Sequence, residues 1–171
     1  VRSALHRAEE QSDVSIREAY LMLAGSHIGC TSNEGSIPIL SPDQEIAEED
    51  LDTVGKAART VNLGDDREIL HTLNRYYGVD SQTGIVNPVG MEGAKLTLNV
   101  LIVHGIASRI RNAVKLVRSV PLEVRDVAFS GLCAGLSVLT PRQKDSGVLV
   151  IDLGGGTTDL VGYADRNFAV A

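Results

Sequence analysis

The stretch VLVIDLGGGTTD, residues 148–159, decides how this chain is interpreted. Its first four residues form a continuous apolar strand, and three consecutive glycines follow shortly after it. Residues 160–163 are rich in β formers, and residues 164–167 predict a turn into a last strand over 168–170. The pattern therefore predicts that the glycines lie at the tip of a β-hairpin.

This hairpin context separates the glycine loop from two common nucleotide-binding motifs. Walker A loops and dinucleotide fingerprints both place a helix after the glycines, and Walker A also needs a lysine that this stretch lacks. The glycines still allow backbone N–H groups to converge without Cβ obstruction, which forms a concavity for phosphate oxygens. Asp152 is placed to hold Mg²⁺ through its water shell, and the Thr157 hydroxyl can bond the same phosphates. The alternative is a plain glycine hairpin with a structural role.

Composition restricts the class of protein. The chain has 171 residues, with 16 Lys plus Arg against 22 Asp plus Glu and a formal net charge of -6, which excludes a generic nucleic-acid binder. No stretch approaches the roughly 18 apolar residues of a membrane helix, and the first residues match no signal peptide, so we expect a cytosolic chain. Cys30, Cys133 and the four histidines are scattered, which gives no support for a disulfide or a zinc site. The chain lacks an initial methionine and stops at Ala171 after an unfinished strand, so we expect a piece of a longer protein.

Between the amino terminus and the hairpin, periodicity predicts a mixture of helices and strands. The strand over 36–40 is expected at a sheet edge because Pro38 cannot donate to a neighbouring strand. A helix is expected to start at Ser41, Pro42 and Asp43, because serine can cap it and proline suits its first turn. The other expected elements are a helix over 1–11, a buried strand over 14–23, a strand over 67–79, a loop over 78–93, a strand over 96–102, a helix over 106–117, a strand over 124–129, a helix capped by Ser130 that ends near 139, and a charged connector over 142–147.

Two of the expected helices carry opposite charge. Six of the ten residues from 43 to 52 are Asp or Glu, whereas Arg109, Arg111, Lys115 and Arg118 make the helix after 106 basic. The acidic residues fit a solvated face near a helix N-terminus, and the alternative is a docking surface for a basic partner. Such a pair of helices favours complementary contacts, within the unit or between copies.

The glycine stretch resembles a known phosphate loop. Asp-Leu-Gly-Gly-Gly-Thr followed by Thr-Asp is similar to the second phosphate loop of the actin and heat-shock chaperone ATPase superfamily. Within that superfamily the chain resembles, essentially from end to end, the FtsA family of bacterial cell-division proteins. The segments that carry this resemblance are AGSHI at 24–28, EGSIPI at 34–39, GIVNPVG at 84–90, AFSGL at 128–132 and SVLT at 137–140. The Asn-Pro-Val-Gly loop is the most diagnostic of them, because generic actin relatives have no equivalent.

The resemblance implies an α/β (α+β) chain that is part of an actin-like ATPase fold. Residues 1–26 and 118–146 would be two parts of a discontinuous domain 1A. Residues 27–117 would be an inserted helix-strand-strand-helix domain, 1C. Residues 147–171 would open domain 2A with its phosphate-binding hairpin.

For the site, the resemblance implies that ATP and Mg²⁺ bind between domains 1A and 2A. Gly154, Gly155, Gly156 and Thr157 would contact the phosphates, Asp152 would hold Mg²⁺ through water, and Thr158 and Asp159 would support the hairpin. We expect no catalytic residue in this chain and at most weak ATPase activity in the whole protein. Because the other phosphate hairpin and the adenosine loop are not among these residues, we expect this piece alone to bind ATP weakly or not at all.

For the cell, the resemblance implies a protein at the cytoplasmic face of the inner membrane, at the division site. Such a protein polymerises, links FtsZ to the membrane and recruits later divisome proteins through its 1C domain. Recruitment would map to residues 27–117, whereas FtsZ binding and membrane attachment would use a domain and a C-terminal amphipathic helix outside this chain. The open edges of the hairpin would favour self-association.

Two other functions remain open at this point. The chain could belong to an actin-fold ATPase of another role, such as a pilus-assembly or chaperone-type protein. It could also be a protein-interaction module that binds no nucleotide and whose glycine hairpin is only structural. The Asn-Pro-Val-Gly loop at 87–90 and the edge strand at 37–39 favour the division protein over the other ATPase, whereas the interaction module stays open.

Overall fold

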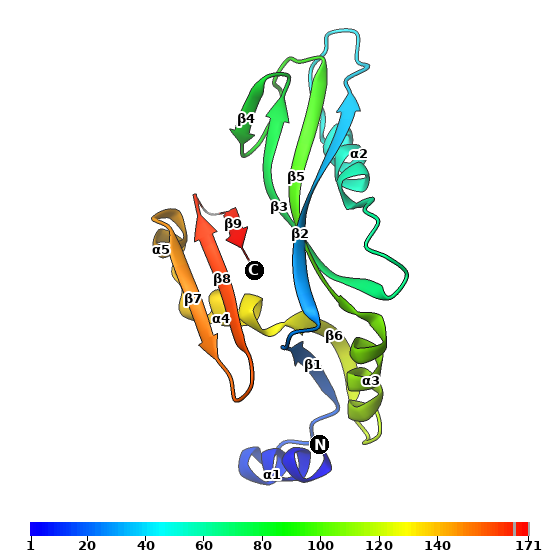
Figure 1. Cartoon of the computed structure of the whole chain (residues 1–171), viewed down its shortest axis with the longest axis vertical. Coiled ribbons are helices and arrows are strands. Elements are labelled where there is room, and N and C mark those ends of the chain that lie inside the picture. The colour runs from blue at the N-terminus through cyan, green and yellow to red at the C-terminus, as the bar shows by residue number, and fades with distance from the viewer. Residues whose placement is uncertain (166, 171) are drawn as a thin grey trace.

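The computed structural model describes residues 1–165 and 167–170, which form a mixed α/β arrangement with three separate sheets (Figure 1). Most of the expected elements are present, and the largest sheet lies at one end of an elongated molecule. In chain order the elements are α1 (Arg2–Ser12), β1 (Glu18–Leu23), β2 (Ile28–Pro38), α2 (Glu48–Arg59), β3 (Arg67–Val79), β4 (Gln82–Ile85), β5 (Lys95–Ile106), α3 (Ala107–Val117), β6 (Glu123–Phe129), α4 (Ser130–Val138), α5 (Pro141–Asp145), β7 (Val148–Leu153), β8 (Thr158–Ala164) and β9 (Asn167–Val170).

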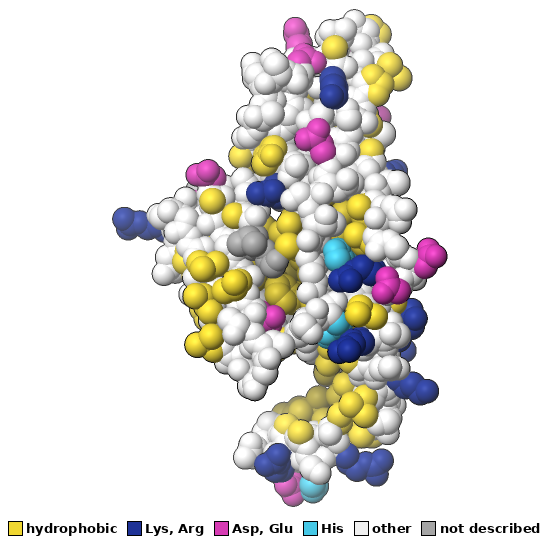
Figure 2. Space-filling view, in the orientation of Figure 1, with side chains coloured by type: hydrophobic (Ala, Val, Ile, Leu, Met, Phe, Trp, Pro, Cys, Tyr) yellow, Lys and Arg dark blue, Asp and Glu magenta, His cyan; other side chains and the backbone are white. Residues whose placement is uncertain are grey.

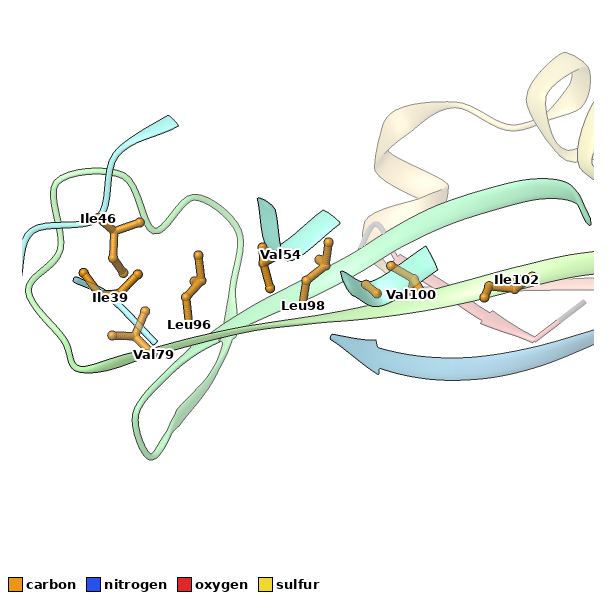
Figure 3. Packing of buried hydrophobic residues seen from close by; sticks show 9 residues of the cluster. Ile39, Ile46, Val54, Val79, Leu96, Leu98, Val100 and Ile102 are labelled. Atoms are coloured by element: carbon orange, nitrogen blue, oxygen red, sulfur yellow. The ribbon is translucent and has the colours of Figure 1, made fainter. Parts of the chain in front are cut away.

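The largest sheet has four antiparallel strands in the order β2-β5-β3-β4. Strand β5 lies in its interior, and α2 covers one face. Leu96, Leu98 and Val100 alternate along β5 toward that face and pack with Val54 of α2 (Figure 3). These side chains are at most 1% exposed, so this sheet and its helix close an apolar core of their own.

The edge position predicted for the Pro38 strand is confirmed, because β2 lies at one edge and Pro38 is its last residue. The strand begins earlier than expected, at Ile28. Its middle lies directly under α2: a Cβ on Gly35 would stand 2.3 Å from the Ala58 nitrogen. The Asn33 side chain donates to the Ala58 carbonyl at 2.8 Å and so caps the last turn of α2.

The predicted helix start at Ser41, Pro42 and Asp43 is wrong. Residues 41–44 form a turn, in which the Gln44 N–H donates to the Ser41 carbonyl at 3.0 Å, and α2 begins only at Glu48. The reason is tertiary: Ile46 exchanges backbone hydrogen bonds with Met91 and Gly90 and is 1% exposed in the core. These contacts hold the segment extended and override the local signal for a helix.

Two shorter sheets lie beside the four-stranded sheet. Strands β1 and β6 pair in parallel, and β7, β8 and β9 form an antiparallel sheet. The prediction of a buried strand over 14–23 is wrong in part, because β1 starts at Glu18 and exposes Tyr20 and Met22, while Leu23 is buried. The apolar run had suggested burial on both faces, but one face of β1 has no cover from the described residues.

Two predicted connections contain secondary structure. The loop over 78–93 includes β4, which pairs with β3 after a turn at Asp80, where φ is +51°. The charged connector contains α5, whose first turn is closed by reciprocal hydrogen bonds between Thr140 and Gln143. The helices expected over 1–11 and 106–117 and the strands over 67–79 and 124–129 are confirmed within a residue or two.

Candidate phosphate-binding site

The glycine stretch forms the predicted β-hairpin. Strands β7 and β8 pair antiparallel, with Asp152 opposite Asp159 and Leu153 opposite Thr158. The Gly154 N–H donates to the Thr157 carbonyl at 2.9 Å and closes the loop. The described residues after the glycines form strands β8 and β9 and no helix, so the distinction from a Walker A loop is confirmed.

The three glycines differ in what the chain itself requires of them. A Cβ on Gly154 would lie 2.9 Å from the Thr157 carbonyl oxygen, so the turn leaves no room for a side chain there. A Cβ on Gly155 or Gly156 would meet nothing within 4 Å, and neither residue has a left-handed backbone. Their exposed N–H groups make no hydrogen bond to the described part of the chain. Folding alone therefore does not explain glycine at these two positions.

Two carboxylates face each other beneath the loop. Asp152 and Asp159 are directly opposed across β7 and β8, on the face that also carries Val161 and Tyr163. Asp159 is half-buried and accepts a hydrogen bond from the Ser130 hydroxyl at 2.9 Å. Asp152 is exposed and has no hydrogen bond or ion pair to another described residue. The two acids therefore differ, since one is held by the protein and the other is available to a ligand.

A cleft of about 400 Å³ opens beside the hairpin. Thr157, Thr158 and Asp159 form one wall, and the turn at Gly25 and Ser26 after β1 forms another. The remaining lining is apolar and comes from Ile28, Gly29, Val103, Phe129 and Leu160. The hairpin, the end of β1 and the start of β2 in the four-stranded sheet thus meet at one place.

The sequence indicated the hairpin residues but missed the other side of this cleft. Ser130 was expected to cap α4, and that prediction is wrong: Phe129 precedes the helix, and the Ser130 hydroxyl bonds Asp159 instead. Gly25, Ser26 and Phe129 lie in segments that carried the family resemblance, at 24–28 and 128–132, and this was the available signal. Nothing in the spacing along the chain shows that these segments meet the hairpin.

A second groove lies away from the hairpin, between β3, α3 and β6. Its volume is about 530 Å³, and Ile69, Leu70, Ile110, Val114 and Val127 give it an apolar floor. Arg111 and Lys115 of α3 line it, as do Arg118 directly after α3, Glu68 and Asp126. The Arg111 guanidinium lies 3.9 Å from the Glu68 carboxylate. Figure 2 shows basic side chains gathered on the side of the molecule where α3 lies.

Comparison with known proteins matches this arrangement. Residues 25–104 match the family described as the SHS2 domain inserted in FtsA. The chain is 36% identical to the cell division protein FtsA of Escherichia coli strain K12 over 163 residues, which is 95% of this chain and 38% of that protein. It is 34% identical to the cell division protein FtsA of Buchnera aphidicola subsp. Schizaphis graminum over 165 residues, which is 96% of this chain and 39% of that protein. It is also 34% identical to the cell division protein FtsA of Neisseria meningitidis serogroup B over 163 residues, which is 95% of this chain and 39% of that protein.

The fold and the family match therefore assign the chain to a class of proteins in which an SHS2 domain is inserted between strands of an actin-like fold. The chain belongs to the FtsA family of cell-division proteins, as the sequence resemblance predicted. The relatives that it matches are named as cell division proteins. The chain spans less than two fifths of the length of these relatives. Within the described residues, no helix combines the length and apolar character that crossing a membrane requires.

The family match also bears on the predicted domain limits. The match ends at residue 104, close to the end of β5, whereas the predicted inserted domain continued to 117 and included α3. Helix α3 packs against β5 of the inserted sheet and against β6 of the flanking one. The assignment of α3 to either domain stays a prediction.

Proposed function

We propose that this chain supplies one phosphate-binding hairpin of an actin-like division protein that binds ATP with Mg²⁺. The observation that carries the proposal is the pair Gly155 and Gly156, whose glycine identity nothing in the described fold requires. Close approach of a phosphate to their free N–H groups would explain it, because any Cβ would stand in the way of the ligand.

The opposed carboxylates support a cation at the same place. Side chains directly opposite on antiparallel strands have Cβ atoms roughly 4.5–5.5 Å apart, and like charges at that separation destabilise the pair. The hydrogen bond from the Ser130 hydroxyl partly stabilises the negative charge of Asp159, whereas no described residue does the same for Asp152. A hydrated Mg²⁺ at Asp152 would relieve the repulsion and bridge to the phosphates, since Mg²⁺ commonly keeps several waters and binds through one or two carboxylates.

The wider role follows the family. Adenosine contacts, the other phosphate hairpin, FtsZ binding and membrane attachment would come from regions of the whole protein outside this chain. In that protein, at the cytoplasmic face of the membrane at the division site, we infer polymerisation and at most weak ATP hydrolysis. The single hairpin would contribute phosphate and metal contacts and would hold ATP weakly by itself.

The glycine loop offers a direct test in a full-length family member that carries this sequence. Gly156→Ala should weaken ATP affinity at least about tenfold by calorimetric titration with Mg²⁺, because its methyl group would occupy the phosphate position. The same substitution should leave thermal stability unchanged, since the Cβ meets no atom of the chain.

Gly55→Ala is the matched control, because Gly55 of α2 also has open space for a Cβ but lies far from the hairpin in sequence and fold. It should leave ATP affinity unchanged. Equal ATP affinity in Gly156→Ala and wild type would contradict phosphate binding by this loop. Asp152→Ala that retains full Mg²⁺-dependent affinity would instead favour a structural hairpin.

The groove along α3 supports a second part of the function, the recruitment of later divisome proteins. Its apolar floor and its three basic residues suit a short segment with apolar and acidic side chains. Arg111→Ala combined with Lys115→Ala should weaken binding of cytoplasmic segments of later division proteins, measured by fluorescence anisotropy. Arg2→Ala combined with Arg7→Ala on α1 is the control, and equal losses in both double variants would contradict the groove as the site.

A further inference from the structure

Two consecutive residues at the start of α4 are bonded to the other two parts of the molecule. The Phe129 N–H donates to Nε2 of His71, in β3 of the inserted sheet, at 2.9 Å. The Ser130 hydroxyl donates to a carboxylate oxygen of Asp159, in β8 of the glycine hairpin, also at 2.9 Å. Both hydrogen bonds are partly buried, where they are better protected from water. These two adjacent residues, the Phe129–Ser130 step, therefore connect the hairpin with the inserted sheet.

The side chains around Phe129 and Ser130 are closely packed. The Phe129 ring is 4% exposed and belongs to a cluster with Val103 of β5 and with Val161 and Tyr163 of β8. A Cβ on Gly131 would lie 2.8 Å from both the Phe129 ring and a Val161 methyl group. Because such contacts are close-packed, a displacement of β8 would move Phe129 and its N–H as well.

The hydrogen bond to His71 requires a particular form of the ring. Nε2 accepts the Phe129 N–H, so it carries no proton, and a neutral ring has its proton on Nδ1. Burial lowers the pKa of His71, and the negative charge of Asp126 on β6 opposes that shift. His71 is thus a neutral acceptor whose position depends on β6 and on the start of α4.

We propose that the Phe129–Ser130 step couples phosphate binding at the hairpin to the inserted sheet, with Ser130 and His71 as positioning residues. The proposal rests on the proposed function, because it takes ATP as the ligand of the hairpin. Phosphate and Mg²⁺ at Asp152 and the glycine loop would reposition Asp159, and Asp159 would draw Ser130 and Phe129 with it. By linkage, a partner that fixes the inserted sheet at β3 would change ATP affinity by the same factor.

The test uses a full-length family member with this sequence. Amide hydrogen exchange over residues 67–79 is measured with and without Mg²⁺-ATP, alongside ATP affinity by calorimetry. In the wild-type protein we expect ATP to slow exchange in this strand severalfold. His71→Leu, which removes the acceptor, should bind ATP within about twofold of wild type but lose most of the exchange response. His71→Gln is the matched control, because its amide oxygen can accept the same N–H, and it should keep the response.

Ser130 provides a second variant that removes a single oxygen. Ser130→Ala should weaken ATP affinity about fivefold and reduce the exchange response, and Ser130→Thr should restore both. A wild-type protein that binds no ATP would overturn the proposed function and this proposal together. A wild-type protein that binds ATP without any change over 67–79, or a Ser130→Ala or His71→Leu protein that responds like wild type, would overturn the coupling alone.

Discussion

The inserted sheet and the glycine hairpin use apolar residues in opposite ways. In the inserted sheet, β5 places Leu96, Leu98 and Val100 under α2, and all three are at most 1% exposed. In the hairpin, the outward face of β7 carries Leu149, Ile151 and Leu153, which are 52%, 55% and 78% exposed. Figure 2 shows hydrophobic side chains gathered over this part of the molecule.

This difference indicates that the stability of the two regions depends to different degrees on contacts with other parts of the protein. Residues 28–106 close their core with a helix from the same segment. The hairpin buries one face against α4 and leaves the other without cover from the described residues. Stability should therefore be local in the first region and conditional on further contacts in the second.

The largest expected effect compares one core residue in each region. Leu98→Ala should destabilise the inserted sheet by about 3 kcal/mol, because it removes a fully buried side chain and leaves a cavity. Ile151→Ala should change the free energy of unfolding much less, by about 0.5 kcal/mol, because that side chain is already 55% exposed. Urea unfolding followed by far-ultraviolet circular dichroism measures both. Similar losses in the two variants would show that the hairpin face is buried in solution.

Glycine substitutions sharpen the same comparison. Gly35→Ala should cost about 1–3 kcal/mol, because its Cβ would stand 2.3 Å from the backbone of α2 and the helix would have to move. Gly156→Ala should be neutral for stability, and Gly55→Ala in α2 should stabilise by about 0.5–1 kcal/mol through helix propensity. Thermal unfolding of the three variants in parallel is the measurement. A neutral Gly35→Ala would contradict the close packing of β2 against α2.

The exposed face of the hairpin should cause association of this chain. Leu149→Glu combined with Leu153→Lys should weaken self-association roughly tenfold, since charges would replace apolar contacts between copies. Sedimentation equilibrium over a range of concentrations gives the dissociation constants. Val86→Glu is the control, because Val86 is 83% exposed in a loop of the inserted sheet. A monomeric wild-type chain at high concentration would remove the basis for this prediction.

The smallest expected effect is a pH dependence confined to the inserted sheet and its junction. Burial lowers the pKa of His27, His71 and His104 below 6.5, and Arg67 adds to the shift at His27 and His104, as Arg109 does at His27. The unfolded chain therefore binds protons that the folded chain resists, so stability is full above pH 6.5 and declines as the pH falls through the folded values. Urea midpoints should be lower at pH 5.5 than at pH 7.5, and His71→Gln should reduce the difference. An unchanged midpoint would show that these rings titrate normally.

The sequence predicted the hairpin side of the candidate site well, because its chemistry is local. The apolar run, the glycines and the β formers after them lie within one short segment, and their order is enough to predict the hairpin. The structure adds the register, with Asp152 opposite Asp159. The other side of the cleft could not be predicted in the same way. Ser130 was interpreted from its neighbours as a helix cap, whereas its partner lies 29 positions away on another strand.

In the fold too, the elements set by local sequence could be predicted and those set by distant contacts could not. Strands β3 and β5 follow from periodicity, and Pro38 correctly indicated an edge. The start of α2 did not follow, because Ile46 is held by Gly90 and Met91, more than forty residues later in the chain. The sequence did not predict the exposure of Tyr20 and Met22. An apolar run shows that a strand has side chains suited to burial, but it does not show whether another element covers them.

The two ends of the inserted sheet have a consequence for how such a protein can be built. Ile28 pairs with Gly105, and the Ile106 N–H donates to the His27 carbonyl, so the segment leaves its host almost where it entered. At the two chain connections the host therefore needs only a pair of neighbouring strands, whatever the length of the segment between them. Because the two attachment points are adjacent, the length of such a segment adds little loop-closure entropy to the folding of its host.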